Sequence, residues 1–138
     1  MIAARQGENI HSVYQLPLAH IFFFGATSAG CQVLIYPGAF NLTTGPLHWE
    51  LLQRSRAVDN QVFVSMCSPA RDMTAGYHAW GHSMVVDPMG RVLAEAGEGE
   101  GIIYARIEPE VLQSTRAGIP VTVQRRFDVY PDVSQSPN

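Results

Sequence analysis

Two short apolar runs separated by a helical pattern constrain the fold of this chain more than any other feature. Residues 31–37 read CQVLIYP and residues 61–67 read QVFVSMC, and continuous apolar runs of this length are typical of strands buried on both faces. Between them, residues 47–60 follow the period of a helix and place Leu47 and Leu51 on one face. A strand, a helix and a second strand in this order predict an α/β unit.

The ends of this helix are marked by local signals. Pro46 fits the first helical position, where its missing N–H costs nothing, and Asn60 fits the left-handed residue that ends a helix. Val58 continues the apolar face. Glu50 precedes Arg54 by four residues, which is the favourable order for an ion pair. We interpret these two as a structural pair and not as catalytic residues.

Downstream of the second strand we expect a polar loop, a hairpin, a further strand and a short helix. Asp87, Pro88 and Gly90 occupy the first, second and fourth positions of a type I turn. The expected elements are a loop at 68–81, hairpin strands at 82–86 and 91–97, a strand at 101–108 and a helix from Pro109 to Gly118. One long helix cannot cover both faces of so apolar a sheet, so another part of the fold or a partner is expected to cover the second face.

The chain divides into three parts by pattern, and its composition excludes several classes of function. Residues 1–30 form a lead without a sustained period, residues 31–118 the folded part and residues 119–138 an extended tail. The net charge of −3 and the absence of a basic run argue against nucleic acid as a partner. The apolar segment 16–24 is too short to span a bilayer, and a targeting peptide is not expected. We expect a cytoplasmic location, with a mitochondrial one as the alternative.

All nine cationic side chains are arginine, so the sequence contains no lysine ammonium group. Cys31 and Cys67 lie in apolar runs and are predicted to be buried, unreactive thiols. An alternative pairs Cys67 as a nucleophile with His78 or His82. The two histidines have the spacing of metal ligands on a helix, but Trp80 and a glycine between them disfavour a helix, and no metal site is expected.

Several motifs together make the chain similar to a known family. They are PGAFN at 37–41, HWELL at 48–52, GHS at 81–83 and DPMG at 87–90. Over about residues 30–130 the chain closely resembles the C-terminal half of the omega-amidase branch of the nitrilase superfamily of carbon-nitrogen hydrolases. The resemblance implies an α/β (α+β) fold that forms the C-terminal half of a four-layer α-β-β-α sandwich, usually in a dimer or larger homo-oligomer.

The resemblance also implies a chemistry, which is cofactor-free hydrolysis of omega-amides of short dicarboxylic acids such as alpha-ketoglutaramate. In the family a Cys attacks the amide, a Glu moves protons and a Lys stabilises the oxyanion. These three residues lie upstream of the matching region, and this chain has no lysine, so no catalytic residue is carried over. We therefore expect a truncated hydrolase that is inactive alone, or a non-catalytic chain that associates with a nitrilase-type subunit.

Two sets of residues are carried over as site residues. The first borders the substrate pocket in the family, and its members are Phe40, Asn41, Thr43 and Thr44. The second helps to build the subunit interface, and its members are His48, Trp49, Leu52 and Arg56. For the two threonines a second role is equally open, since their hydroxyl groups can instead satisfy N–H donors at the start of the helix.

Overall fold

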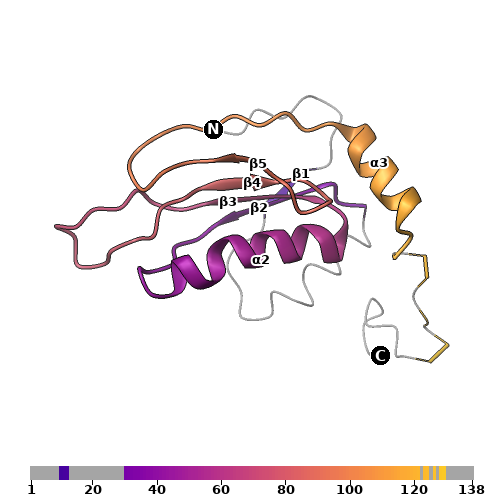
Figure 1. Cartoon of the computed structure of the whole chain (residues 1–138), viewed down its shortest axis with the longest axis horizontal. Coiled ribbons are helices and arrows are strands. Elements are labelled where there is room, and N and C mark those ends of the chain that lie inside the picture. Colours follow the sequence, from indigo (N-terminus) through magenta and orange to yellow (C-terminus); the bar gives the residue numbers. More distant parts are fainter. Residues whose placement is uncertain (1–9, 13–29, 122, 125, 127, 130–138) are drawn as a thin grey trace.

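The computed structural model describes residues 10–12, 30–121, 123–124, 126 and 128–129 of the 138-residue chain. These residues form a five-stranded mixed sheet in the order β1-β2-β3-β4-β5, together with two helices (Figure 1). The strands are Ile10–Ser12 (β1), Val33–Pro37 (β2), Phe63–Cys67 (β3), Met84–Val86 (β4) and Val92–Glu95 (β5). The helices are Thr44–Asn60 (α2) and Pro109–Gly118 (α3). The predicted α/β class is confirmed.

The strand–helix–strand unit predicted from the apolar runs forms the centre of the sheet. β2 pairs in parallel with β3, in a register that places Leu34 opposite Val64, and α2 makes the connection between them. β1 adds a parallel strand on one side, and the β4–β5 hairpin adds antiparallel strands on the other. The parallel β2–β3 pair is thus connected by a helix, as a parallel crossover requires, and the antiparallel β4–β5 pair by a tight turn.

Side-chain alternation along β2 and β3 divides the interior into two clusters. The cluster between the sheet and α2 contains Cys31, Leu34, Ala57, Val62, Val64, Met84 and Val86. The cluster on the opposite face contains Val33, Phe63 and Leu112, with Ile35, Ile107 and Val111 packed against it. Full burial of a Val, Leu, Phe or Met side chain in these clusters stabilises the fold by about 1.5–3 kcal/mol. α2 runs along one face of the sheet, whereas α3 lies at one end of the assembly (Figure 1).

The buried face of α2 is not its most apolar one. Leu47 and Leu51 are each 61% exposed, and Val58 is also exposed. We call these three residues the α2 stripe. The face that packs against the sheet instead carries Gly45, Trp49, Gln53, Ala57 and Asn60. The predicted helix is confirmed, but Leu47 and Leu51 point away from the chain's own core.

Both predicted ends of α2 are displaced slightly. The helix begins at Thr44, so Pro46 is its third residue and not its first. The residue in the left-handed region is Gln61, with φ 50°, and not Asn60, whose side-chain amide donates to the Arg56 carbonyl at 2.9 Å. Asn60 completes the last turn by this bond, and the change of backbone direction comes one residue later.

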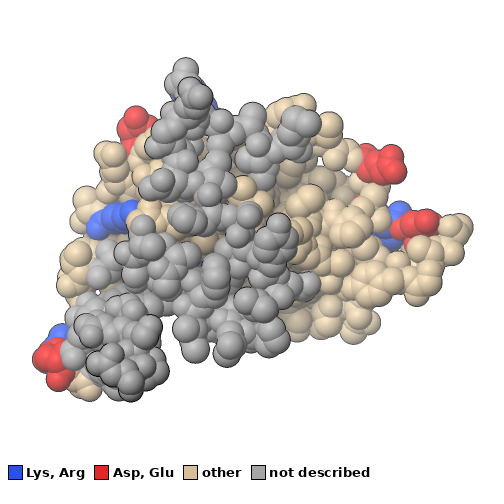
Figure 2. All heavy atoms as spheres, turned by 180° about the vertical axis from the view of Figure 1, so that it is seen from behind, with Lys and Arg blue, Asp and Glu red and all other residues tan. Residues whose placement is uncertain are grey.

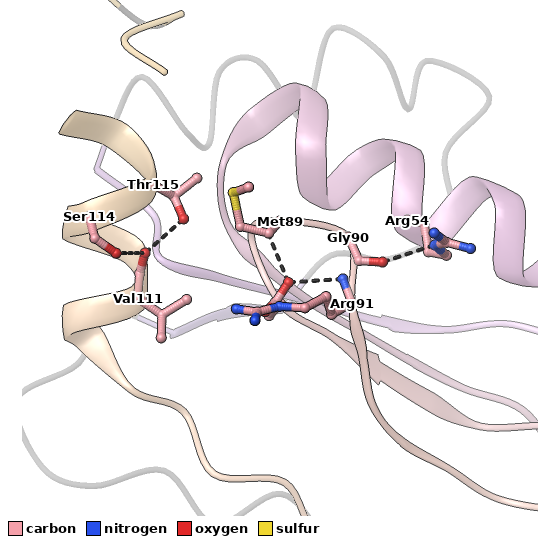
Figure 3. A network of polar contacts seen from close by, with 8 residues as sticks. Arg54, Met89, Gly90, Arg91, Val111, Ser114 and Thr115 are labelled. Atoms are coloured by element: carbon pink, nitrogen blue, oxygen red, sulfur yellow. Dashed lines mark hydrogen bonds and ion pairs between the residues drawn. The ribbon is translucent and has the colours of Figure 1, made fainter. Parts of the chain in front are cut away.

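The predicted type I turn at Asp87–Gly90 is present and is tied to α2. The Gly90 N–H donates to the Asp87 carbonyl at 2.9 Å, which closes the turn. Arg54 reaches from α2 to the Gly90 carbonyl at 2.9 Å (Figure 3). Arg54 also forms the expected helix-surface pair with Glu50 at 3.0 Å, so its role is structural.

Two expectations from the sequence are wrong. Residues 101–108 form no strand, and Tyr104 is 79% exposed. Ile102–Ala105 line a groove together with Val33, Ser65 and Val85, so the segment crosses the face of the sheet and does not extend its edge. The thiol of Cys67 is exposed and not buried, because Cys67 is the last residue of β3 and lies beyond the helix-covered core; Cys31 is buried as predicted.

The remaining expectations concern the ends of the chain and its surface. Within the lead, residues 10–12 form β1, and the rest of residues 1–29 lies outside the described part, as does most of the tail after residue 121. Acidic and basic side chains lie scattered over the described surface and do not gather into a basic patch on the face in Figure 2. Among the described residues, no helix is both long enough and apolar enough to cross a membrane.

Candidate functional site

The segment from the end of β2 to the first residue of α2, residues 38–44, contains the pocket-border residues predicted from the resemblance, and we call it the rim loop. Asn41 organises it. Its Oδ1 atom accepts hydrogen bonds from the Thr43 N–H (3.0 Å), the Thr44 N–H (2.8 Å) and the Thr44 hydroxyl (3.0 Å). These bonds satisfy N–H donors at the start of α2, so Asn41 performs the capping role considered for the threonines. The Thr44 hydroxyl is used within the loop, while Thr43 makes no side-chain capping bond.

Aromatic side chains fix the base of the rim loop. Phe40 meets Trp49 of α2 edge to face, with ring centroids 5.2 Å apart. Trp49 is almost fully buried and donates its indole N–H to the His82 carbonyl at 2.6 Å. The packing of the rim therefore depends on α2 on one side and on the segment before β4 on the other.

The loop at residues 68–82 lies along the rim loop and bonds to its backbone. Trp80 donates its backbone N–H to the Phe40 carbonyl at 2.7 Å, and Ala79 forms an isolated antiparallel bridge with Asn41. The Tyr77 hydroxyl donates to the Ala39 carbonyl at 3.2 Å. These contacts hold residues 39–41 in a fixed path even though the segment belongs to no strand.

A stacked group of charged and aromatic side chains supports this second loop. The Arg71 guanidinium lies over the Trp80 ring at 4.9 Å, and His82 stacks on the same ring system at 4.5 Å with an interplanar angle of 21°. His82 Nδ1 lies 2.9 Å from Glu95 Oε1 of β5. Arg71 pairs with Glu98. Sequence reasoning missed Arg71, Trp80 and Tyr77; the run of aromatic residues in YHAWG was the signal that the loop is packed.

A separate hydrogen-bonded turn lies in the same loop and is exposed. Asp72 accepts from the Thr74 hydroxyl at 2.7 Å and from the Thr74 N–H at 2.8 Å. These hydrogen bonds to its charged form hold the pKa of the Asp72 carboxyl below its usual value. The turn joins residues 72–75 of the loop to one another.

The proposed nucleophile pair of Cys67 and a histidine finds no support in the contacts. Cys67 is exposed and borders the apolar groove of about 190 Å³ beneath residues 101–107. His82 is occupied by Glu95 and Trp80, and among the described residues no hydrogen bond joins Cys67 to His78 or His82. The part of the chain that the structure describes also holds no group of three metal-ligating side chains.

The four predicted interface residues differ in their accessibility. His48 is exposed, Leu52 and Arg56 are half-buried, and Trp49 is buried inside the chain itself. Arg56 lies 3.8 Å from Asp59 one turn along the helix. A role of this helix in an interface stays a prediction. The α2 stripe beside these four residues exposes more apolar surface than they do.

Comparison with known proteins identifies the class. The carbon-nitrogen hydrolase family model matches residues 22–117, more than half of the chain, so the chain belongs to the carbon-nitrogen hydrolase family. Within that family the chain is a homologue of the omega-amidases. It is 65% identical over 105 residues to the omega-amidase NIT3 of Saccharomyces cerevisiae, covering 76% of this chain and 36% of that one. It is 64% identical over 101 residues to the omega-amidase NIT2 of Homo sapiens, covering 73% and 37%.

Solved structures agree with this assignment. The crystal structure of Saccharomyces cerevisiae Nit3, described as a member of branch 10 of the nitrilase superfamily, matches with a TM-score of 0.76 and 52% identity, covering 84% of this chain and 43% of that one. The Caenorhabditis elegans NitFhit protein matches with a TM-score of 0.73 and 34% identity, covering 85% and 30%. The described architecture is thus part of the nitrilase fold, and the chain spans just over a third of the length of these curated omega-amidases.

Proposed function

We propose that this chain supplies the scaffold and the substrate-pocket rim of an omega-amidase-type hydrolase, within one half of a four-layer α-β-β-α sandwich. The observation that carries the proposal is the order of the rim loop. Asn41 accepts three hydrogen bonds, and the 68–82 loop bonds to three successive rim residues, Ala39, Phe40 and Asn41. A loop held in this way is preorganised to bind a small ligand.

The rim presents donors suited to a carboxylate or an amide. With its Oδ1 atom occupied by donors, Asn41 has its Nδ2 group left to donate, and the Thr43 hydroxyl is exposed beside it. Omega-amides of short dicarboxylic acids carry a carboxylate at one end and an amide at the other. We assign the rim to the recognition of such a substrate, with alpha-ketoglutaramate as the representative.

The reaction itself requires groups that this sequence lacks. A thiolate attacks the amide carbon, ammonia leaves after a general acid protonates it, and water then cleaves the thioester to give the second carboxylate. The chain has no lysine to stabilise the oxyanion, and among the described residues no hydrogen bond joins the exposed Cys67 to a histidine that could act as its base. We infer that nucleophile, base and ammonium come from polypeptide outside this sequence and that the chain alone is inactive.

Association is the second part of the proposal. The exposed α2 stripe and the apolar groove beneath residues 101–107 are surfaces that a soluble chain normally covers. We propose that the chain assembles with a second copy or with a nitrilase-type subunit through α2.

Ammonia release from alpha-ketoglutaramate tests the proposal. The full chain is assayed alone and after co-expression with the residues of the yeast omega-amidase NIT3 that lie outside the matched region. We expect release only from the co-expressed pair, with KM raised by Thr43→Val and activity unaffected by Cys67→Ser. No release from the pair would overturn the scaffold proposal. Release by the chain alone that Cys67→Ser abolishes would establish instead a thiol hydrolase that uses Cys67.

A further inference from the structure

Trp80 fills a space that only a glycine leaves open. Gly45 is buried in the first turn of α2, and a Cβ atom placed on it would lie 2.2 Å from Trp80 Cγ and 2.5 Å from Trp80 Cβ. Real Cβ atoms essentially never come this close to another atom. The Trp80 side chain therefore lies directly against the helix backbone at the point where the rim loop enters α2.

Trp80 is attached to the rim by its backbone as well as by its ring. Its N–H donates to the Phe40 carbonyl at 2.7 Å. The residue before it, Ala79, bridges to Asn41, whose side chain caps α2. Any shift of Trp80 would thus be passed to both Phe40 and Asn41.

Arg71 holds Trp80 in this place through several contacts. Its Nη2 group donates to the Trp80 carbonyl at 2.8 Å, its Nε group donates to the Ala79 carbonyl at 3.3 Å, and its guanidinium lies over the Trp80 ring. The opposite end of the guanidinium pairs with Glu98, while the Arg71 N–H donates to the Glu98 carbonyl at 2.7 Å. The Arg71 side chain is only 16% exposed. A planar fork with five donors makes all of these contacts, and an ammonium group cannot.

We infer that Arg71 is a positioning residue for substrate binding. Arg71 lies outside the rim loop, and none of the bonds described joins it to Phe40, Asn41, Thr43 or Thr44. It acts on these residues through Trp80, whose position it fixes. Glu98 is its anchor on the segment after β5. The inference rests on the proposed function, since it gives the rim its role in binding an omega-amide.

Hydrogen exchange on the full chain tests the positioning without requiring activity. The reporters are the Thr44 and Gly45 amides, bonded to Asn41, and the Phe63 amide in the sheet, bonded to Gln32. With Arg71→Lys and Arg71→Gln we expect the exchange rate at the two rim amides to rise by about tenfold, with no change at Phe63. A tenfold rise corresponds to the loss of one charge-assisted contact that holds the rim closed. Arg106→Gln is the matched control, because Arg106 is exposed and its one ion pair within the described part of the chain is with Glu108. Unchanged rim exchange in both variants, or an equal rise at Phe63, would overturn the inference.

Kinetics in the co-expressed pair test the link to substrate. We expect Arg71→Lys to raise KM for alpha-ketoglutaramate by about tenfold while kcat changes by less than about twofold, because a displaced rim weakens binding and leaves the reacting groups in place. A fall in kcat at constant KM would contradict the assignment. If the unmodified pair releases no ammonia, the proposed function fails, and the exchange experiment still decides whether Arg71 positions the rim.

Discussion

The indole nitrogen of Trp49 lies 2.6 Å from the carbonyl oxygen of His82, and this bond joins the second turn of α2 to the segment that leads into β4. His82 has a left-handed backbone, with φ 57°, and follows Gly81 at φ 79°. These two residues turn the chain so that the His82 carbonyl points at the helix while the ring stacks on Trp80. The Trp49 side chain therefore links the rim loop to the segment that leads into the hairpin.

Trp49→Phe is expected to lower the free energy of unfolding by about 1–3 kcal/mol, because it leaves the His82 carbonyl without its donor and reduces the packed volume. The aromatic contact with Phe40 remains possible in this variant. Urea denaturation measures the change, with Met73→Ala, a side chain that is 61% exposed and lies outside α2, as the control at less than about 0.5 kcal/mol. Equal effects of the two substitutions would show that the bond does not stabilise the chain.

Gly81→Ala is expected to destabilise the chain by about 2–4 kcal/mol. A Cβ atom at Gly81 would lie 2.8 Å from Glu98 Cα, and the backbone is in the left-handed region. Gly97→Ala is the matched control, because a Cβ atom there meets nothing within 4 Å. Thermal unfolding of the two variants should differ in midpoint by several degrees, with Gly81→Ala the lower. A Gly81→Ala variant as stable as the control would contradict the close approach of these two segments.

Asp87→Asn tests the turn that α2 holds through Gly90. The Asp87 carboxylate is buried and accepts from the Met89 and Arg91 N–H groups at 2.9 Å and from Arg91 Nε at 2.7 Å. Loss of its charge weakens all three bonds, so we expect a loss of about 1–3 kcal/mol in denaturant unfolding. Asp59→Asn, at a side chain that is 62% exposed, should cost less than about 0.5 kcal/mol. A loss for Asp87→Asn no larger than the control would show that the charge is unimportant to the turn.

Local signals in the sequence were sufficient for most of the fold. The apolar runs of β2 and β3, the helix that connects them, the Asp87–Gly90 turn and α3 were all predicted, since each depends on residues close together in the chain. No strand forms at 101–108, because the apolar residues of this segment lie over the face of the sheet. Such packing depends on tertiary contacts, which the alternation of apolar and polar residues along the chain does not reveal. Cys67 was placed in the core because its run is apolar, but position at a strand end decides its exposure.

The candidate site was predictable only in part. The PGAFN and HWELL motifs point to the rim loop and to α2, whereas the contacts of Arg71 and Trp80 with them cross between distant segments. Spacing along a chain does not reveal such contacts. The orientation of α2 was hidden for the same reason: its leucines fit a core-facing helix, yet Trp49 and Ala57 face the sheet.

Stability should fall at high pH through Tyr36. Burial raises the pKa of the Tyr36 phenol well above its ordinary value of about 10, and the nearby Arg56 opposes this only partly. Above pH 10 the unfolded chain loses the phenolic proton while the folded chain keeps it, so stability is fully present below this pH and declines above it. The expected slope is about 1.4 kcal/mol per pH unit between pH 10 and 12. Denaturant unfolding of the wild type and Tyr36→Phe across this range measures it, and Tyr36→Phe should show a shallower decline. Parallel curves would contradict the burial of the phenol.

The α2 stripe predicts association that depends on concentration. Leu47 and Leu51 expose most of their surface on the side of α2 that faces away from the sheet, and removing such side chains from water favours contact with a second apolar surface. Leu51→Glu places a charge in the middle of the stripe without touching the chain's own core. Sedimentation velocity over a range of concentrations should therefore show the wild type associating and Leu51→Glu remaining a smaller species. Glu100→Gln removes an exposed charge away from α2 and serves as the control, which should associate like the wild type. A wild-type chain that stays monomeric and melts in a single sharp transition would contradict both the association and the view that this chain is part of a larger assembly.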